Sequence, residues 1–209
     1  MKVTLLGDSI RQQYDNRVRE ILGEDFEVWS PKDNCRFVQF TLRGLFEWAE
    51  SMSGSQIVHW NNGHWDVCRL FDDGTFSDED DYIRNMLRVA EILQKRNCLV
   101  IFATTTPVRD INQYNRNEDI DRFNRRLVPL LRERKVIIND LNGLLRDDIE
   151  ANICEDTIHL SGTGVSLCAE QVAKCIREAA EMLKYRTDCA ETKNDRENTT
   201  EIGAPVLIE

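Results

Sequence analysis

The feature that most constrains this chain is a regular alternation between two kinds of segment. Short apolar runs rich in β-branched and aromatic residues lie at 3–6, 26–29, 57–60, 98–104 and 136–138. Longer stretches with a helical pattern separate them. Strands that alternate with helices pair in parallel, with the helices packed on both faces of the sheet. We therefore predict an α/β fold, a three-layer α/β/α sandwich around a mostly parallel sheet of about five strands.

Apolar residues at helical spacing mark the longest helices. Between 83 and 90 they recur at i, i+3, i+4 and i+7, and similar sets lie within 120–131 and 165–183. Pro129 should kink or restart the second of these helices. From about Arg186 the periodicity is lost and the sequence becomes polar. We predict one domain over residues 1–185 and a mobile tail over 186–209.

Charge and cysteine content exclude several classes of protein. The chain has 37 acidic and 27 basic residues, a formal net charge of −10, which argues against a nucleic-acid binder. The apolar run near the first residue is too short for a signal peptide, and no run is long enough to span a membrane. The seven cysteines are scattered without a C-x-x-C pair, which favours reduced thiols in the cytoplasm over disulfides or a zinc site.

The turn Gly7-Asp8-Ser9 lies between the first predicted strand and a helical pattern that begins near Arg11. This position places the Ser9 hydroxyl at the carboxyl edge of the sheet, where α/β sheets bind ligands. The Ser9 N–H would lie at a helix N-terminus, which favours an anion. The same residues are also typical of a simple helix cap. Ser9 is thus a candidate nucleophile.

Two further segments could supply partners for Ser9. Asp156 and His159 precede the last helix, and a carboxylate with this spacing can orient an imidazole. They could equally begin a turn and fill the interior. Asn61 and Asn62 follow the third strand, where they suit either a turn or an amide donor to an oxyanion. All three segments fall on one edge of the predicted sheet, which favours a catalytic site.

Three motifs follow one another along the chain: G-D-S with a following apolar residue, then N-N-G, then D-x-x-H. With this order they resemble the GDSL/SGNH hydrolase superfamily over residues 3 to about 180. The resemblance implies a flavodoxin-like sheet and a catalytic triad of Ser9, Asp156 and His159. It implies an oxyanion hole made by the Ser9 N–H, the side chain of Asn62 and a backbone N–H after the second strand. Asn61 is the alternative to Asn62.

The residue that supplies the backbone N–H after the second strand is the main departure from the family. The family has a glycine there, whereas residues 30–37 contain none. We assign the position to Asn34, because asparagine tolerates a positive φ better than most residues. Gly44 is the rival, but it lies within a stretch with helical character.

The resemblance implies hydrolysis of a small carboxylic ester through an acyl-enzyme, without metal or organic cofactor. O-acetylated carbohydrate is the first substrate hypothesis, since tryptophans flank the third motif and the superfamily acts on such esters. A short-acyl lipid esterase or lysophospholipase and an acyltransferase are the alternatives among enzymes. A catalytically silent SGNH-fold module that binds a glycan or a protein is the alternative from another class. The sequence does not predict the oligomeric state.

Other polar residues lie near the predicted site. His64 and Asp66 could form a second pair of catalytic base and orienting acid, although a role in shaping the pocket is the better interpretation. Residues 104–107 should lie on the rim of the site, and Arg109 could bind an acidic group or face solvent. His59 is interpreted as an interior histidine.

Overall fold

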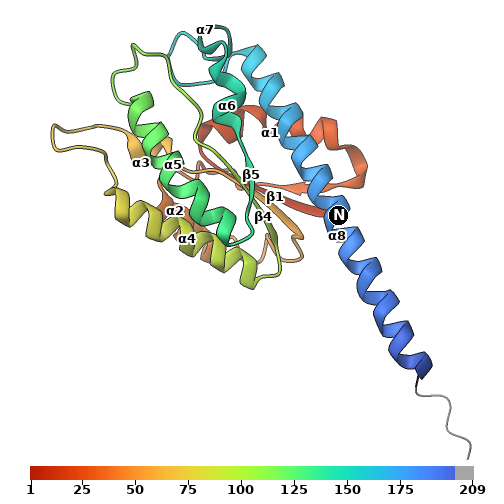
Figure 1. Cartoon of the computed structure of the whole chain (residues 1–209). Helices are drawn as coiled ribbons and strands as arrows, with labels where there is room; N and C mark the ends of the chain where they lie inside the picture. Colours follow the sequence, from red (N-terminus) through yellow and green to blue (C-terminus); the bar gives the residue numbers. More distant parts are fainter. Residues whose placement is uncertain (201–209) are drawn as a thin grey trace, which may run out of the picture.

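Five parallel strands form the centre of the molecule, in the order β2-β1-β3-β4-β5. The computed structural model describes residues 1–200, with side chains to residue 185. The strands are β1 (Lys2–Leu6), β2 (Glu27–Trp29), β3 (Ile57–Trp60), β4 (Leu99–Ala103) and β5 (Ile137–Asn139). Each predicted strand is present, with bounds within two residues of those expected. The predicted α/β/α sandwich is confirmed (Figure 1).

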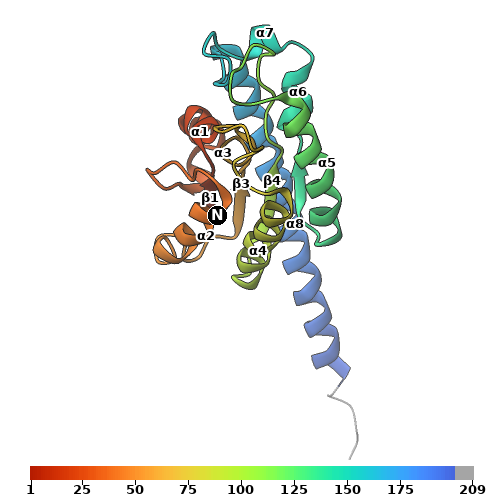
Figure 2. The same cartoon turned by 90° about the vertical axis from the view of Figure 1, so that its left-hand side faces the viewer.

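Helices cover both faces of the sheet. One face carries α1 (Ser9–Leu22), α6 (Leu141–Arg146) and α8 (Gly162–Thr200), and the other carries α2 (Val38–Glu47), α4 (Glu79–Lys95) and α5 (Asn117–Glu133). The short helices η1 (Gly23–Asp25), α3 (His64–Val67) and α7 (Ile149–Asn152) lie in connections. Figure 2 looks onto the face that carries α2, α4 and α5, with α8 behind the sheet.

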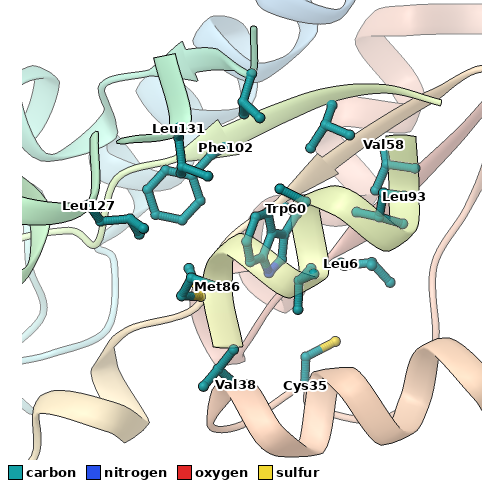
Figure 3. Packing of buried hydrophobic residues seen from close by; sticks show 14 of the residues in the cluster. Leu6, Cys35, Val38, Val58, Trp60, Met86, Leu93, Phe102, Leu127 and Leu131 are labelled. Atoms are coloured by element: carbon teal, nitrogen blue, oxygen red, sulfur yellow. The ribbon is translucent and has the colours of Figure 1, made fainter. Parts of the chain in front are cut away.

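Alternation of side chains along the strands builds two separate cores. In β3, Ile57 faces α1 and α8, while Val58 and Trp60 face α2 and α4. Trp60 is completely buried and packs against Phe102 of β4, with ring centroids 5.2 Å apart. Figure 3 shows Trp60 between the sheet and α4. A strand that is buried on both faces has a largely apolar sequence, as β3 does here.

Two predictions about helices differ from the structure. Helix α5 continues through Pro129 without restarting. Pro129 is exposed, so the backbone hydrogen bond that it removes lies on the solvent side, where water can satisfy the freed carbonyl. Helix α8 continues to Thr200, so the first fifteen residues of the predicted tail are helical. Residues 201–209 of that tail, and the Cys189 side chain, lie outside the described residues.

The strand order determines where a ligand can bind. In this order the connections leave β1 and β3 in opposite directions across the sheet, so a crevice opens between their carboxyl ends. Leu6 and Trp60, the last residues of these two strands, are in register with each other. The segments that follow them, at Gly7 and Asn61, therefore begin at the same level of the sheet.

Candidate active site

Ser9 lies at the switch point, as the first residue of α1. Asp8 is the N-cap, and its Oδ1 accepts hydrogen bonds from the Ile10 N–H (3.0 Å) and from Asn61 Nδ2 (3.1 Å). The helix-cap interpretation of the turn is therefore correct for Asp8, and it leaves the Ser9 side chain available. The Ser9 N–H is one of the first N–H groups of the helix, which have no partner within it.

The three predicted triad residues are in hydrogen-bond contact. Ser9 Oγ lies 2.9 Å from His159 Nε2, and His159 Nδ1 lies 2.8 Å from Asp156 Oδ2. A carboxylate can only accept, so the imidazole carries its proton on Nδ1 and accepts from the Ser9 hydroxyl at Nε2. This is the arrangement in which a histidine can take the proton of a serine nucleophile.

Asp156 also determines the local backbone conformation. Its Oδ1 accepts from the N–H groups of Ile158 (3.1 Å) and His159 (2.9 Å). Partial burial raises the pKa of Asp156, but these backbone hydrogen bonds and the His159 side chain outweigh it and lower the pKa overall. The alternative interpretation, a turn that begins at Asp156, thus holds together with the triad interpretation, because one carboxylate does both.

Arg109 holds the loop that carries the triad acid and base. Its Nε donates to the Ile153 carbonyl (3.0 Å), and its guanidinium forms an ion pair with Glu150 (2.8 Å). The backbone N–H of Arg109 donates to the carbonyl of Thr157, a residue with a φ of +74°. Arg109 therefore neither binds an acidic ligand nor points freely to solvent. Sequence reasoning missed this role, because nothing local connects Arg109 to a loop more than forty residues away.

Asn62 does not face the pocket that Ser9 lines. Its side chain is fully buried: Oδ1 accepts from Trp60 Nε1 (2.6 Å) and Thr41 Oγ1 (2.9 Å), and Nδ2 donates to the Arg36 carbonyl (2.7 Å). Asn61, the alternative, uses its Nδ2 on Asp8. The geometry therefore does not support the predicted oxyanion role for either amide. Both instead hold neighbouring segments together.

Asn34 lies at the site, whereas its rival does not. Asn34 lines the same pocket as Ser9 and His159, and its Oδ1 accepts from the Arg36 N–H (2.7 Å). The reason given for choosing it is wrong, since the residue with positive φ in this loop is Arg36, at +47°. Gly44 lies inside α2, where a Cβ atom would be only 2.3 Å from the Trp48 ring.

His64 and Asp66 do not form a pair. His64 lines the pocket, with Nε2 2.8 Å from Thr106 Oγ1, and burial lowers its pKa. Asp66 points elsewhere: its Oδ1 accepts from the Val38 N–H (3.2 Å) and Ser77 Oγ (2.8 Å). A role for His64 in shaping the pocket agrees with this geometry, and a second catalytic pair does not.

Two other predictions have clear outcomes. The threonines at 104, 105 and 106 are at most 5% exposed, so they lie beneath the site rather than on its rim. Their side chains bind Asp140, the Asn62 carbonyl and His64. His59 is an interior residue in contact with Asn139 (3.0 Å), and burial lowers its pKa to about 3.

A pocket of about 370 Å³ opens beside Ser9 and His159. Its walls are largely apolar or aromatic, with exposed fractions of 42% for Trp65, 51% for Leu70 and 54% for Tyr114. The residues that line it are Ser9, Asn34, His64, Trp65, Cys68, Leu70, Tyr114, Asn115, Ile158 and His159. The volume is at the lower end of those that hold small organic ligands.

The described residues contain neither a cluster that could hold a metal ion nor a helix that could cross a membrane. Across this part of the chain, no three His, Cys, Asp or Glu side chains lie close enough to hold a metal ion. Within the same residues, no helix combines the length and apolar character that a membrane crossing requires.

Sequence comparison identifies no relative: no protein-family model and no curated protein matches the chain. Its structural neighbours, however, are GDSL/SGNH lipases, acylhydrolases and acetyl xylan esterases. An acetyl xylan esterase, AlAXEase, matches with a TM-score of 0.72 and 20% identity over 84% of this chain and 100% of its own. A lipase/acylhydrolase from Enterococcus faecalis matches with a TM-score of 0.70 and 14% identity, covering 85% and 96% of the two chains.

A catalytic mutant of an acetylxylan esterase from Geobacillus stearothermophilus also matches, with a TM-score of 0.69 and 16% identity over 84% of this chain and 93% of that one. These identities are low, so the likeness concerns the fold. Together with the sheet order, they show that this chain has the α/β fold of the SGNH hydrolases.

Proposed function

We propose that this protein is a serine ester hydrolase with Ser9 as nucleophile, His159 as general base and Asp156 as the acid that orients it. The observation that carries the proposal is the continuous chain of contacts from Ser9 Oγ through the imidazole to Asp156 Oδ2, at 2.9 and 2.8 Å. These contacts open onto a pocket large enough for a small ester.

In the proposed reaction the Ser9 oxygen attacks the ester carbonyl while His159 Nε2 takes the hydroxyl proton. Asp156 stabilises the imidazolium, which then returns the proton to the departing alcohol. Water, activated by the same imidazole, releases the acid from the acyl-enzyme. The N–H groups of Ser9 and Asn34 stabilise the tetrahedral oxyanion, while Asn62 supports the loop at Arg36 from behind. No step requires a metal or an organic cofactor.

Two substrate classes follow from the walls of the pocket. The exposed rings of Trp65 and Tyr114 could stack on a sugar, which supports O-acetylated carbohydrate, and two structural neighbours are named as acetyl xylan esterases. Leu70 and Ile158 add aliphatic surface, which supports a short-acyl lipid ester as the second candidate. Transfer of the acyl group to an alcohol would use the same residues.

The first experiment compares wild-type protein with Ser9→Ala on p-nitrophenyl acetate. We expect kcat to fall by at least about 10³-fold in Ser9→Ala, because the nucleophile is lost, with no change in Tm. Ser166→Ala, which removes an exposed hydroxyl bound only within α8, is the control and should keep full activity. Equal turnover in Ser9→Ala would contradict the assignment.

Acetate release from acetylated xylo-oligosaccharides, measured beside p-nitrophenyl butyrate and octanoate, separates the two substrate classes. A wild type that is silent on all of these esters would instead favour a catalytically silent binding module.

A reducing, cytoplasmic setting stays a prediction; the six cysteines with described side chains are all free.

A further inference from the structure

The loop after β2 brings Asn34 to the pocket without the glycine that its family relatives are expected to have. The Asn34 N–H donates to no group in the described part of the chain. Its neighbour Cys35 is bound on both sides to the nucleophile turn: the Cys35 N–H donates to the Gly7 carbonyl (3.0 Å), and the Gly7 N–H donates to Cys35 Sγ (3.2 Å). Asn34 is therefore held beside Ser9 with a free N–H.

The direction of this N–H follows from a contact of the preceding carbonyl. Arg11 Nη2 donates to the Asp33 carbonyl at 2.9 Å. The Asp33–Asn34 peptide is trans, so its C=O and N–H point in opposite directions. Arg11 is 2% exposed and does not line the pocket. A carbonyl turned toward Arg11 therefore turns the Asn34 N–H away from the interior, toward the side where the pocket lies.

Arg11 is itself held rigidly. Its Nη1 forms a buried ion pair with Asp15 Oδ2 at 2.8 Å, and its Nη2 also approaches the Gly7 carbonyl at 3.4 Å. The planar guanidinium thus spans three groups: the carboxylate of α1, the nucleophile turn and the loop after β2. A lysine has a single nitrogen and could not hold Asp15 and the Asp33 carbonyl in the same geometry.

We propose that Arg11 is a positioning residue of the oxyanion hole, which replaces the conformational freedom of the missing glycine. It fixes the Asp33 carbonyl, and thereby keeps the Asn34 N–H aimed at the oxygen that becomes negative when Ser9 attacks. Preorganised donors of this kind act on the transition state more than on the bound substrate. The inference rests on the proposed esterase function.

The test is Arg11→Met, measured for kcat, KM and inhibition by a short alkylboronic acid, which forms a tetrahedral adduct with a serine. We expect kcat to fall by roughly 10- to 100-fold, with KM within about twofold, because one oxyanion donor is lost and substrate binding is not. The inhibition constant of the boronic acid should rise by the same factor as kcat falls. Arg11→Lys should show the same pattern.

Two variants of the same ion-pair cluster serve as controls. Asp15→Asn removes the charge that Arg11 pairs with but keeps an oxygen that can accept from Arg11 Nη1, so the guanidinium stays in place and keeps its bond to the Asp33 carbonyl. Arg19→Met removes the second arginine bound to Asp15 (2.9 Å), whose other partners are the Val28 carbonyl and Ser30 Oγ and not the Asp33–Asn34 peptide. Both should lower Tm and keep kcat within about twofold of wild type.

A loss of folding can be distinguished from a loss of oxyanion stabilisation. If Arg11→Met does not fold, Arg11→Met/Asp15→Asn removes the unpaired buried carboxylate as well and carries the same expectation. Normal kcat in a folded Arg11 variant, or an equal loss in Asp15→Asn, would overturn the role of Arg11 alone. A wild type without Ser9-dependent turnover would overturn the proposed function, and this inference with it.

Discussion

At the scale of single residues, the turn from β1 into α1 has almost no free space. A Cβ atom on Gly7 would lie 1.9 Å from Asn61 Oδ1 and 2.6 Å from the Arg11 Cβ. Asn61 cannot move aside easily, because it is buried and its Nδ2 is bound to Asp8. Gly7 is therefore required by contact between neighbouring segments, and its position controls where Ser9 lies.

We expect Gly7→Ala to destabilise the fold by about 1–3 kcal/mol, in the range of overpacked buried sites, and to lower kcat at least tenfold by displacing Ser9. Urea unfolding and the p-nitrophenyl acetate assay measure the two effects. Gly162→Ala is the matched control, since nothing lies within 4 Å of a Cβ atom there. It should be neutral or slightly stabilising. If both variants behaved alike, close packing at Gly7 would not be the cause.

At the scale of elements, the start of helix α2 depends on a residue from another segment. Its N-cap, Phe37, offers no side-chain acceptor, and Asp66 supplies one by accepting from the Val38 N–H. Ser77 donates to the same oxygen. Burial raises the pKa of Asp66 to about 7, and the nearby charge of Asp8 adds to this, while the two hydrogen bonds oppose it.

This gives a pH dependence with a definite sign. Between the ordinary pKa of 3.8 and about 7, folded Asp66 binds more protons than unfolded Asp66, so stability is present at low pH and is lost as the pH rises toward 7. Asp66→Asn cannot titrate. We expect wild type to lose on the order of 1–3 kcal/mol relative to Asp66→Asn between pH 5 and pH 8.

Urea unfolding of both proteins at the two pH values measures this difference. Asp73→Asn, at an exposed loop position, is the control and should follow wild type at both values. A constant difference between wild type and Asp66→Asn would show that Asp66 does not titrate in this range.

At the scale of the whole molecule, two apolar cores share one sheet. The core beneath α2, α4 and α5 contains Trp60, and the core beneath α1 and α8 contains Cys168 and Cys175. All five strands contribute side chains to both cores; the outer strands β2 and β5 do so with partly buried residues. Neither core can be exposed without breaking the sheet that supports the other. We therefore propose that residues 1–185 unfold as one domain.

Tryptophan fluorescence and thiol labelling report the two cores separately. We expect the fluorescence transition in urea to coincide with the labelling of Cys168 and Cys175 by a thiol reagent, as cooperative unfolding requires. The half-buried Cys68 and Cys154 provide the control, because they should react before the transition. Two separate midpoints would mean that the halves unfold independently.

Much of the fold could be predicted from the sequence because the patterns that carry it are local. Apolar runs such as 57–60 mark a strand buried on both faces, and helical periodicity at 83–90 marks an amphipathic helix. The positions of the proposed triad were also predictable, since Ser9 lies within G-D-S, and Asp156 and His159 form D-x-x-H. A restart at Pro129 and the end of the last helix before Arg186 are not what the structure has, because solvent exposure and continued helix formation do not depend on the apolar pattern.

By itself the sequence determined the layers, the strands and the identity of the three residues that meet at 2.8–2.9 Å. Only the tertiary structure decided which groups Asn62 and Arg11 bind and that Asn34 lines the pocket. The reason is physical: whether a side-chain amide meets a ligand depends on whether its side chain is buried against other segments or lines the pocket. That burial is set by segments from β2, β3 and α1 packed together, and no local pattern contains it.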